Sequence, residues 1–155
     1  MIPSLALMGD IEAPPSTSFQ ASGDIASPRA QSVSDTLFRA LHLAFSRRTS
    51  AGASPPWRSA AFAKRLLIAS LQWPPNTATR AIEFVGGLVD RDPKLEALLS
   101  TDDRSVDGVY RPELDDPQLC NPFGTNFWEL HVLARTHWSA AVREAAAKVL
   151  SGATA

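Results

Sequence analysis

The sequence predicts an all-α fold built from HEAT- or armadillo-like helical hairpins. Apolar residues recur at three- and four-residue spacing in successive segments, and no segment shows the alternation typical of a half-buried strand. Short connections rich in proline, glycine and serine separate these segments, as expected for antiparallel helix pairs. No fixed-period repeat is visible, so the expectation of stacked hairpins rests on the order and length of the segments.

Length and composition indicate one domain with unstructured ends. The chain has 155 residues, of which 45% are hydrophobic and 20% charged, and its net charge is -1. These values exclude a wholly disordered chain and do not favour a general polyanion binder. Residues 1–32 are rich in serine and proline, so we expect a disordered N-terminal segment, a helical domain over 33–150 and a tail over 151–155. Neither a secretory signal nor a membrane-spanning stretch is visible.

The first predicted helix begins with Ser34 as its N-cap and ends near Arg48. Leu37, Phe38 and Leu41 recur at helical spacing within it. A helix at the end of a stack has an apolar face that needs another repeat or a partner. We therefore expect these three side chains to be exposed and the isolated chain to self-associate.

The next two helices are predicted to form an antiparallel pair. One runs from Trp57 to about Gln72, and its apolar residues are spread too widely for contact with a single neighbour. Trp73-Pro74-Pro75 ends it, because proline cannot continue a helix. Asn76 is the expected cap of the following helix, which continues to Val89.

Two consecutive glycines interrupt the third helix. Gly86 and Gly87 each cost about 1 kcal/mol relative to alanine in a helix interior. Their presence indicates either close approach by a neighbouring backbone or a local kink.

An acidic segment rich in proline follows a short turn that begins at Asp92-Pro93. Within residues 110–126, Pro112, Pro117 and Pro122 each remove a backbone donor and hold the preceding residue extended. We therefore expect a long ordered loop across the surface, which we call the strap.

Two helices are expected after the strap. Thr125 or Asn126 should cap the first, which runs from Phe127 to about Thr136. Ser139 should cap the last helix, which has the clearest apolar periodicity in the chain. Its apolar positions are Val142, Ala145, Ala146, Val149 and Leu150.

Four linked motifs lie between residues 61 and 130. They are an Ala-Phe-x-Lys-Arg-Leu helix at 61–66, a Leu-Ser-Thr-Asp-Asp-Arg turn at 99–104, an Asp-Asp-Pro-x-x-x-Asn-Pro strap at 115–122 and a Trp-Glu-Leu helix start at 128–130. Together they resemble the C-terminal region of the CCAAT-binding-factor/Mak21 family. The resemblance covers roughly Thr36 to Leu150, and members of this family are much longer on the N-terminal side. We therefore expect a fragment or a short form.

The resemblance implies a non-enzymatic nucleolar scaffold that assists assembly of the large ribosomal subunit. It also implies a contribution to DNA replication initiation and chromatin binding. The expected location is the nucleus and nucleolus. Expected partners are other nucleolar complex proteins, of the nucleolar complex protein 2 type, and pre-60S particles, together with chromatin or replication-licensing factors. Contact with RNA fits this set, whereas contact with a membrane does not.

The strap and the helix start after it form the candidate partner-binding or structural motif. Its residues are Asn121, Pro122, Phe127, Trp128, Glu129 and Leu130. In the first turn of a helix, Glu129 is stabilised by the helix dipole. We interpret the motif as structural first and as a partner contact second. The tryptophans at 57, 73, 128 and 138 are expected to be mostly core residues at helix ends.

Basic residues suggest an alternative function as an RNA- or DNA-binding module. The candidate patch is Arg47, Arg48, Arg58, Lys64, Arg65 and Arg80. Such a patch would neutralise phosphates, and its binding would weaken with salt. The competing interpretation is a solvated face in which Lys64 and Arg65 pair with Asp102 or Asp103.

No catalytic, cofactor-binding or metal-binding residue is predicted. The run Asp103-x-Ser105-x-Asp107-Gly108 begins like a calcium-binding loop, but position twelve is a leucine where a bidentate carboxylate is needed. His131 and His137 have no acidic or cysteine ligand at metal spacing. Cys120 is the single cysteine, which excludes an intramolecular disulfide, and it has no basic neighbour in sequence to activate it.

Overall fold

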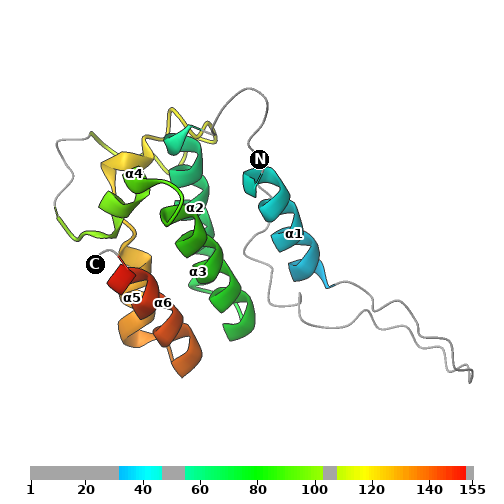
Figure 1. The fold of residues 1–155 in the computed structure, drawn as a ribbon. Helices are drawn as coiled ribbons and strands as arrows, with labels where there is room; N and C mark the ends of the chain where they lie inside the picture. The colour runs from blue at the N-terminus through cyan, green and yellow to red at the C-terminus, as the bar shows by residue number, and fades with distance from the viewer. Residues whose placement is uncertain (1–31, 47–54, 103–107, 153–155) are drawn as a thin grey trace, which may run out of the picture.

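Six α-helices make up the part of the chain that the structure describes. The computed structural model describes residues 32–46, 55–102 and 108–152 (Figure 1). The helices are α1 (Val33–Ser46), α2 (Pro56–Ser70), α3 (Pro75–Val89), α4 (Pro93–Glu96), α5 (Trp128–Thr136) and α6 (Ala140–Gly152), with 3-10 turns η2 (Ala97–Leu99) and η4 (Pro122–Gly124). Every regular element in these ranges is helical, which confirms the all-α class. None of these helices is long and apolar enough to cross a membrane.

The helices form three layers. Figure 1 shows α1 on one side of the α2–α3 hairpin and the α5–α6 hairpin on the other. The main contacts between the two hairpins join α3 to α6, and α2 also contacts α5. α4 and the strap connect the hairpins. Each helix of one hairpin therefore packs on its counterpart in the other.

Proline starts α2, α3 and α4, and two of these helices have no capping side chain. The N-cap residues of α2 and α3 are Pro55 and Pro74, and neither helix has a side-chain cap. The expected cap at Asn76 is therefore wrong. A proline in the first turn has its φ angle already set and lacks the N–H that a cap would satisfy, so this start needs no capping side chain.

α1 also begins earlier than expected. Ser32 Oγ accepts a hydrogen bond from the Asp35 N–H at 3.1 Å, so Ser32 takes the capping role predicted for Ser34. Ser34 is buried and faces Arg80 of α3, with 3.3 Å between its hydroxyl and the guanidinium.

The apolar face of α1 is covered, contrary to expectation. Phe38 is buried in the main core, and Leu37 and Leu41 are half-buried against it. The Arg80 guanidinium lies 4.6 Å from the centre of the Phe38 ring, and it pairs with Asp35 at 2.7 Å. The helix therefore packs its apolar face on α3, which already covers the side chains expected to drive self-association.

The two consecutive glycines of α3 have different surroundings. A Cβ on Gly86 would lie 3.0 Å from Val149 Cγ2 of α6, closer than real Cβ contacts normally are. The nearest atom to a Cβ on Gly87 would be the flexible end of Arg91, at 3.8 Å. At Gly86 the close neighbour is a side chain of α6 and not the backbone that was expected.

The tryptophans do not share one environment. Trp73 is buried at the corner between α2 and α3, whereas Trp57 is half-buried. Trp128 is 45% exposed and Trp138 is 79% exposed. The prediction that most of them are core residues is wrong, because α5 and the corner after it turn both indoles outward.

Candidate functional site

The strap is held by its own hydrogen bonds. The Arg111 N–H donates to the Cys120 carbonyl at 2.8 Å and closes the loop. Asp116 Oδ1 accepts hydrogen bonds from the N–H groups of Gln118 and Leu119, at 2.8 and 3.1 Å. The second aspartate of the Asp-Asp-Pro motif therefore stabilises the turn that follows it.

The end of the strap requires special backbone conformations. Asn121 has a φ of 48° and Gly108 a φ of 92°, both in the left-handed region. A Cβ on Gly124 would collide with the Gly108 carbonyl oxygen and the Tyr110 nitrogen. Asparagine is among the few side chains that tolerate this region, which explains the Asn-Pro step of the motif.

Arg65 fastens the strap to α2. Its guanidinium donates to the Leu114 carbonyl and lies 3.4 Å from Asp115 Oδ1. The expected pairing of Lys64 and Arg65 with Asp102 or Asp103 is therefore wrong for Arg65, and Asp103 lies outside the described residues. The carboxylate within reach of Arg65 is that of Asp115 in the strap.

Lys64 makes a buried ion pair with Glu129. The Lys64 Nζ lies 2.7 Å from Oε1 and 2.9 Å from Oε2 of Glu129, and it donates to the Asn126 carbonyl at 2.7 Å. The two side chains are 2% and 0% exposed. The ring centres of Trp128 and Tyr110 lie 5.1 and 5.9 Å from the ammonium. The ammonium of α2 is thus enclosed by the strap and the first turn of α5.

Burial disfavours the charged form of both side chains in this pair. Burial lowers the pKa of Lys64 below its ordinary range, although the hydrogen bond and charge of Glu129 oppose the shift. Burial likewise raises the pKa of Glu129, and Lys64 opposes that shift. Two charges removed from water lose hydration, and their mutual attraction returns only part of it.

The start of α5 places Glu129 against Lys64. Phe127 is the N-cap residue of α5, and no side-chain cap is present, so the expected caps Thr125 and Asn126 are wrong. Phe127 is buried, and its N–H donates to the Leu98 carbonyl at 2.7 Å. This bond leaves the N–H groups that a capping side chain would bind as they are, but it fixes the start of α5 to η2.

The candidate motif is divided between buried and exposed residues. Pro122, Phe127, Glu129 and Leu130 are buried, and Asn121 is half-buried. Trp128 is the member of the set that reaches solvent. On α5 it lies one turn before Val132, which is also exposed, and Trp138 follows the helix. We call Trp128, Val132 and Trp138 the α5 face.

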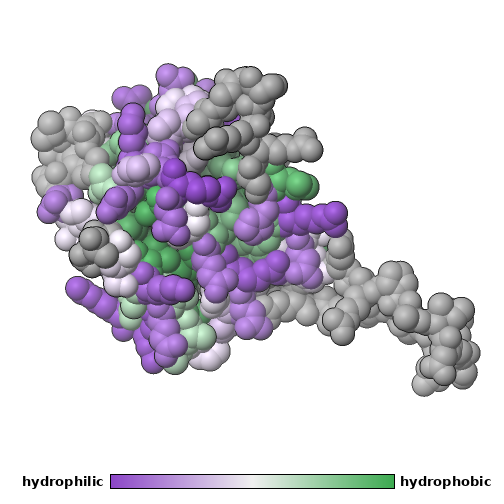
Figure 2. All heavy atoms as spheres, in the orientation of Figure 1, coloured by the Kyte–Doolittle hydropathy of each residue, from purple (hydrophilic) through white to green (hydrophobic). Residues whose placement is uncertain are grey.

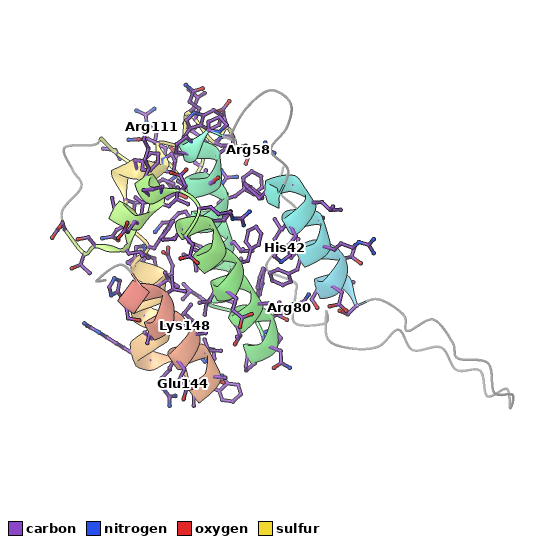
Figure 3. All side chains as sticks on the ribbon, in the orientation of Figure 1. His42, Arg58, Arg80, Arg111, Glu144 and Lys148 are labelled. Atoms are coloured by element: carbon purple, nitrogen blue, oxygen red, sulfur yellow. The ribbon has the colours of Figure 1, made fainter. Side chains whose placement is uncertain are left out.

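The candidate nucleic-acid patch is not assembled by the described residues. Lys64 is buried, and Arg65 and Arg80 pair with Asp115 and Asp35. The Arg58 guanidinium lies 5.5 Å from the centre of the Phe45 ring. Figure 3 shows Arg58 and Arg80 at opposite ends of the α2–α3 hairpin. Arg47 and Arg48 lie outside the described residues.

The remaining residues that were considered for metal binding or catalysis make structural contacts. His131 Nε2 lies 3.0 Å from the Leu99 carbonyl. Burial raises the pKa of the Cys120 thiol, and a high thiol pKa disfavours the reactive thiolate. Within residues 32–46, 55–102 and 108–152, no group of His, Cys, Asp and Glu side chains is placed to hold a metal ion. Residues 103–107, where the sequence begins like a calcium-binding loop, fall outside these ranges.

The comparison with protein families decides the relationship. A model of the CBF/Mak21 family matches residues 25–146. The chain belongs to this family. Its CBF/Mak21 match includes all four sequence motifs, both hairpins up to Ala146 and the Lys64–Glu129 pair.

Similar proteins within the family are nucleolar complex proteins 3. The chain is 38% identical over 96 residues to the nucleolar complex protein 3 homolog of Danio rerio and to that of Homo sapiens. It is 36% identical over 93 residues to the nucleolar complex-associated protein 3 of Schizosaccharomyces pombe. These alignments cover 62%, 62% and 60% of this chain and 12% of each relative. The four linked motifs of the sequence indicated the CBF/Mak21 family, which is confirmed.

Proposed function

We propose that this CBF/Mak21 domain is a non-enzymatic scaffold in a nucleolar complex that assists assembly of the large ribosomal subunit. The observation that carries the proposal is the similarity to nucleolar complex protein 3 in several organisms. The proposed location is the nucleus and nucleolus. A role in replication initiation and chromatin binding belongs to the same proposal as a second activity of the complex.

The geometry supports a binding role. The two hairpins stack helix on helix, as HEAT and armadillo repeats do, and such stacks act by presenting surfaces to partners. The buried Lys64–Glu129 pair and the strap hold one arrangement of the hairpins. On this frame the α5 face exposes two indoles, and tryptophan is enriched among the residues that dominate binding energy at interfaces.

The proposed partners are nucleolar complex proteins, of the nucleolar complex protein 2 type, and pre-60S particles. We place their contact on the α5 face, because Trp128 belongs to the Trp-Glu-Leu motif on which the resemblance to the family partly rests, and its indole is partly exposed. Chromatin or replication-licensing factors are further partners of the assembled complex.

Co-purification from cells tests the proposal. A tagged chain would be expressed as wild type, as Trp138→Ala and as Val109→Ala, and bound proteins would be quantified by mass spectrometry. Trp138 and Val109 are 79% and 76% exposed, so neither change disturbs the core. We expect nucleolar complex proteins with the wild type and Val109→Ala, and a clear loss with Trp138→Ala. Absence of nucleolar proteins from the wild-type sample would contradict the scaffold function, and equal recovery with both variants would contradict the α5 face.

A further inference from the structure

A groove of about 660 Å³ lies between α3, α4 and α6. Its apolar lining comes from Val89 of α3, Pro93 of α4, and Ala145 and Val149 of α6. Pro93 is exposed and the other three are half-exposed. Figure 2 shows this apolar region as a green area bordered by hydrophilic residues. The volume is within the range of about 300–1,000 Å³ that is usual for binding pockets.

Carboxylates border the groove. Glu83 and Asp90 project from the α3 side and Glu96 from α4, and all three are exposed. Within the described ranges of the chain, no hydrogen bond or ion pair uses these carboxylates. Lys148 of α6 is the one basic residue among the lining residues (Figure 3). The side chains therefore give the groove an excess of negative charge.

One helix end adds to this negative charge. α6 ends at Gly152, which lines the groove, and it has no basic residue in its last turn. The C-terminal end of a helix carries a partial negative charge that a basic residue in its last turn usually offsets. The end of α3 is already offset in this way, because Arg91 donates to the Gly87 carbonyl in the last turn of that helix.

We infer that this groove binds a lysine- or arginine-rich segment of another protein, with short apolar side chains between its basic residues. The apolar floor receives the apolar side chains, and the carboxylates pair with the basic ones. This surface is separate from the α5 face, so the two proposals stand independently. The groove disfavours nucleic acid by charge, because phosphates would face three carboxylates and the negative end of α6.

A second copy of the chain is a poorer occupant than another protein. Of its basic side chains on α2 and α3, Lys64 is buried, Arg65 and Arg80 have carboxylate partners, and Arg58 lies on the Phe45 ring. The exposed basic residues Arg39, Lys94, Arg111 and Arg135 stand on four different elements, so the described part of the chain presents no lysine- or arginine-rich segment.

Fluorescence anisotropy with the 155-residue chain tests the inference. The probe is a labelled synthetic peptide of about 14 residues of lysine, leucine and alanine, and a peptide with glutamate in place of lysine is the negative probe. The lysine peptide should bind, and its affinity should fall as salt rises from about 50 to about 200 mM, since exposed charges are screened. The glutamate peptide should not bind.

Matched variants locate the site. Asp90→Asn with Glu96→Gln removes two groove carboxylates, and we expect affinity for the lysine peptide to fall about tenfold, in line with the strength of exposed ion pairs. Asp102→Asn with Glu113→Gln makes the same change in charge on exposed residues elsewhere, and affinity should stay within about twofold of wild type. Lys148→Ala should increase affinity, because it removes the opposing charge.

Three results would overturn the inference. The first is an equal loss of affinity in the groove and control pairs, which would show attraction to net charge alone. The second is a lysine peptide that does not bind the wild type. The third is a single-stranded RNA oligonucleotide or a second copy of the chain that occupies the groove, seen as displacement of the peptide by either one.

Discussion

The two helical hairpins meet at two places of opposite chemistry. Between α2 and α5 the contact is polar: the Lys64 ammonium lies 2.7 Å from a Glu129 oxygen, and both side chains are buried. Between α3 and α6 the contact is apolar: a Cβ on Gly86 would lie 3.0 Å from Val149 Cγ2. One interface holds a charge pair, and the other holds an apolar side chain packed closely on a helix backbone.

This difference indicates separate physical roles. A buried ion pair adds little net stability, because the hydration lost by both charges offsets their attraction. It does penalise every arrangement of the hairpins that leaves one charge buried alone. The contact at Gly86 has no such penalty, and it gains dispersion energy from close packing. We therefore expect the polar contact to select the arrangement and the apolar contact to stabilise it.

The largest expected effect comes from removing one member of the ion pair. Lys64→Met leaves Glu129 as a buried charge without its partner, and the free energy of unfolding should fall by about 3–5 kcal/mol. Urea denaturation followed by circular dichroism would measure the change.

The double variant Lys64→Met with Glu129→Leu is the control for that result. Replacing both charges by apolar groups of similar size is often neutral or stabilising, so much of the lost stability should return. A double variant as unstable as the sum of the single variants would contradict selection by the charge pair, because the two sites would then be independent.

The stability of Lys64→Met should depend on pH, and this dependence tests the role of the polar contact. Burial already raises the pKa of Glu129 in the wild type, and loss of Lys64 removes the main opposing influence. As pH rises, a carboxyl with a raised pKa in the folded state keeps its proton in the folded protein at pH values where the unfolded chain has already released it. The stability that protonated Glu129 gives the variant is therefore complete below the ordinary pKa of 4.5, and it is lost as pH rises through the pKa of the folded state.

Lys64→Met should therefore be closest to wild type in mild acid and least stable near neutral pH. Unfolding curves at several pH values would measure this, with Lys64→Met and Glu129→Gln combined as a control that cannot titrate at this position. If the difference in free energy of unfolding between Lys64→Met and wild type were the same at every pH, Glu129 would not be the source of the instability.

The two glycines of α3 test the apolar contact with a matched pair. Gly86→Ala and Gly87→Ala gain the same helix propensity, about 1 kcal/mol. At Gly86 the new methyl group presses on Val149, and overpacking costs about 1–3 kcal/mol. Gly87→Ala should be more stable than Gly86→Ala by that amount in thermal or urea unfolding. Adding Val149→Ala to Gly86→Ala should relieve the overpacking, and equal stability of the two alanine variants would contradict a close contact at Gly86.

Much of this arrangement could be predicted from local patterns. Helical periodicity and prolines located the helices, and two glycines inside α3 indicated close approach of a neighbour. The capping residues were harder, because a helix can start at a proline without a capping side chain, and contacts with distant residues can fix where a helix begins. The Phe127 N–H donates to Leu98, which no local pattern specifies.

The ion pair was missed for a similar reason. Lys64 and Glu129 are far apart in sequence, and each alone resembles an ordinary surface residue. One signal was available: on α2, Lys64 lies among Ala60, Ala63 and Leu67, so it interrupts a wide apolar arc. A lysine in that position must either leave the core or find a buried carboxylate. Only the packing of α5 on α2 shows that the carboxylate is Glu129.

The smallest expected effect concerns Trp128, which relates the polar contact to the exposed α5 face. Its ring centre lies 5.1 Å from the Lys64 ammonium, although 45% of the side chain is exposed. A cation over a partly exposed ring contributes about 0.5–1 kcal/mol, so Trp128→Leu should lower the free energy of unfolding by that amount.

Trp138→Leu is the matched control, and it should change stability little. In the Lys64→Met background the effect of Trp128→Leu should disappear, because no ammonium remains beneath the ring. An effect that persists there would assign Trp128 to packing alone, and the polar contact would then end at Glu129.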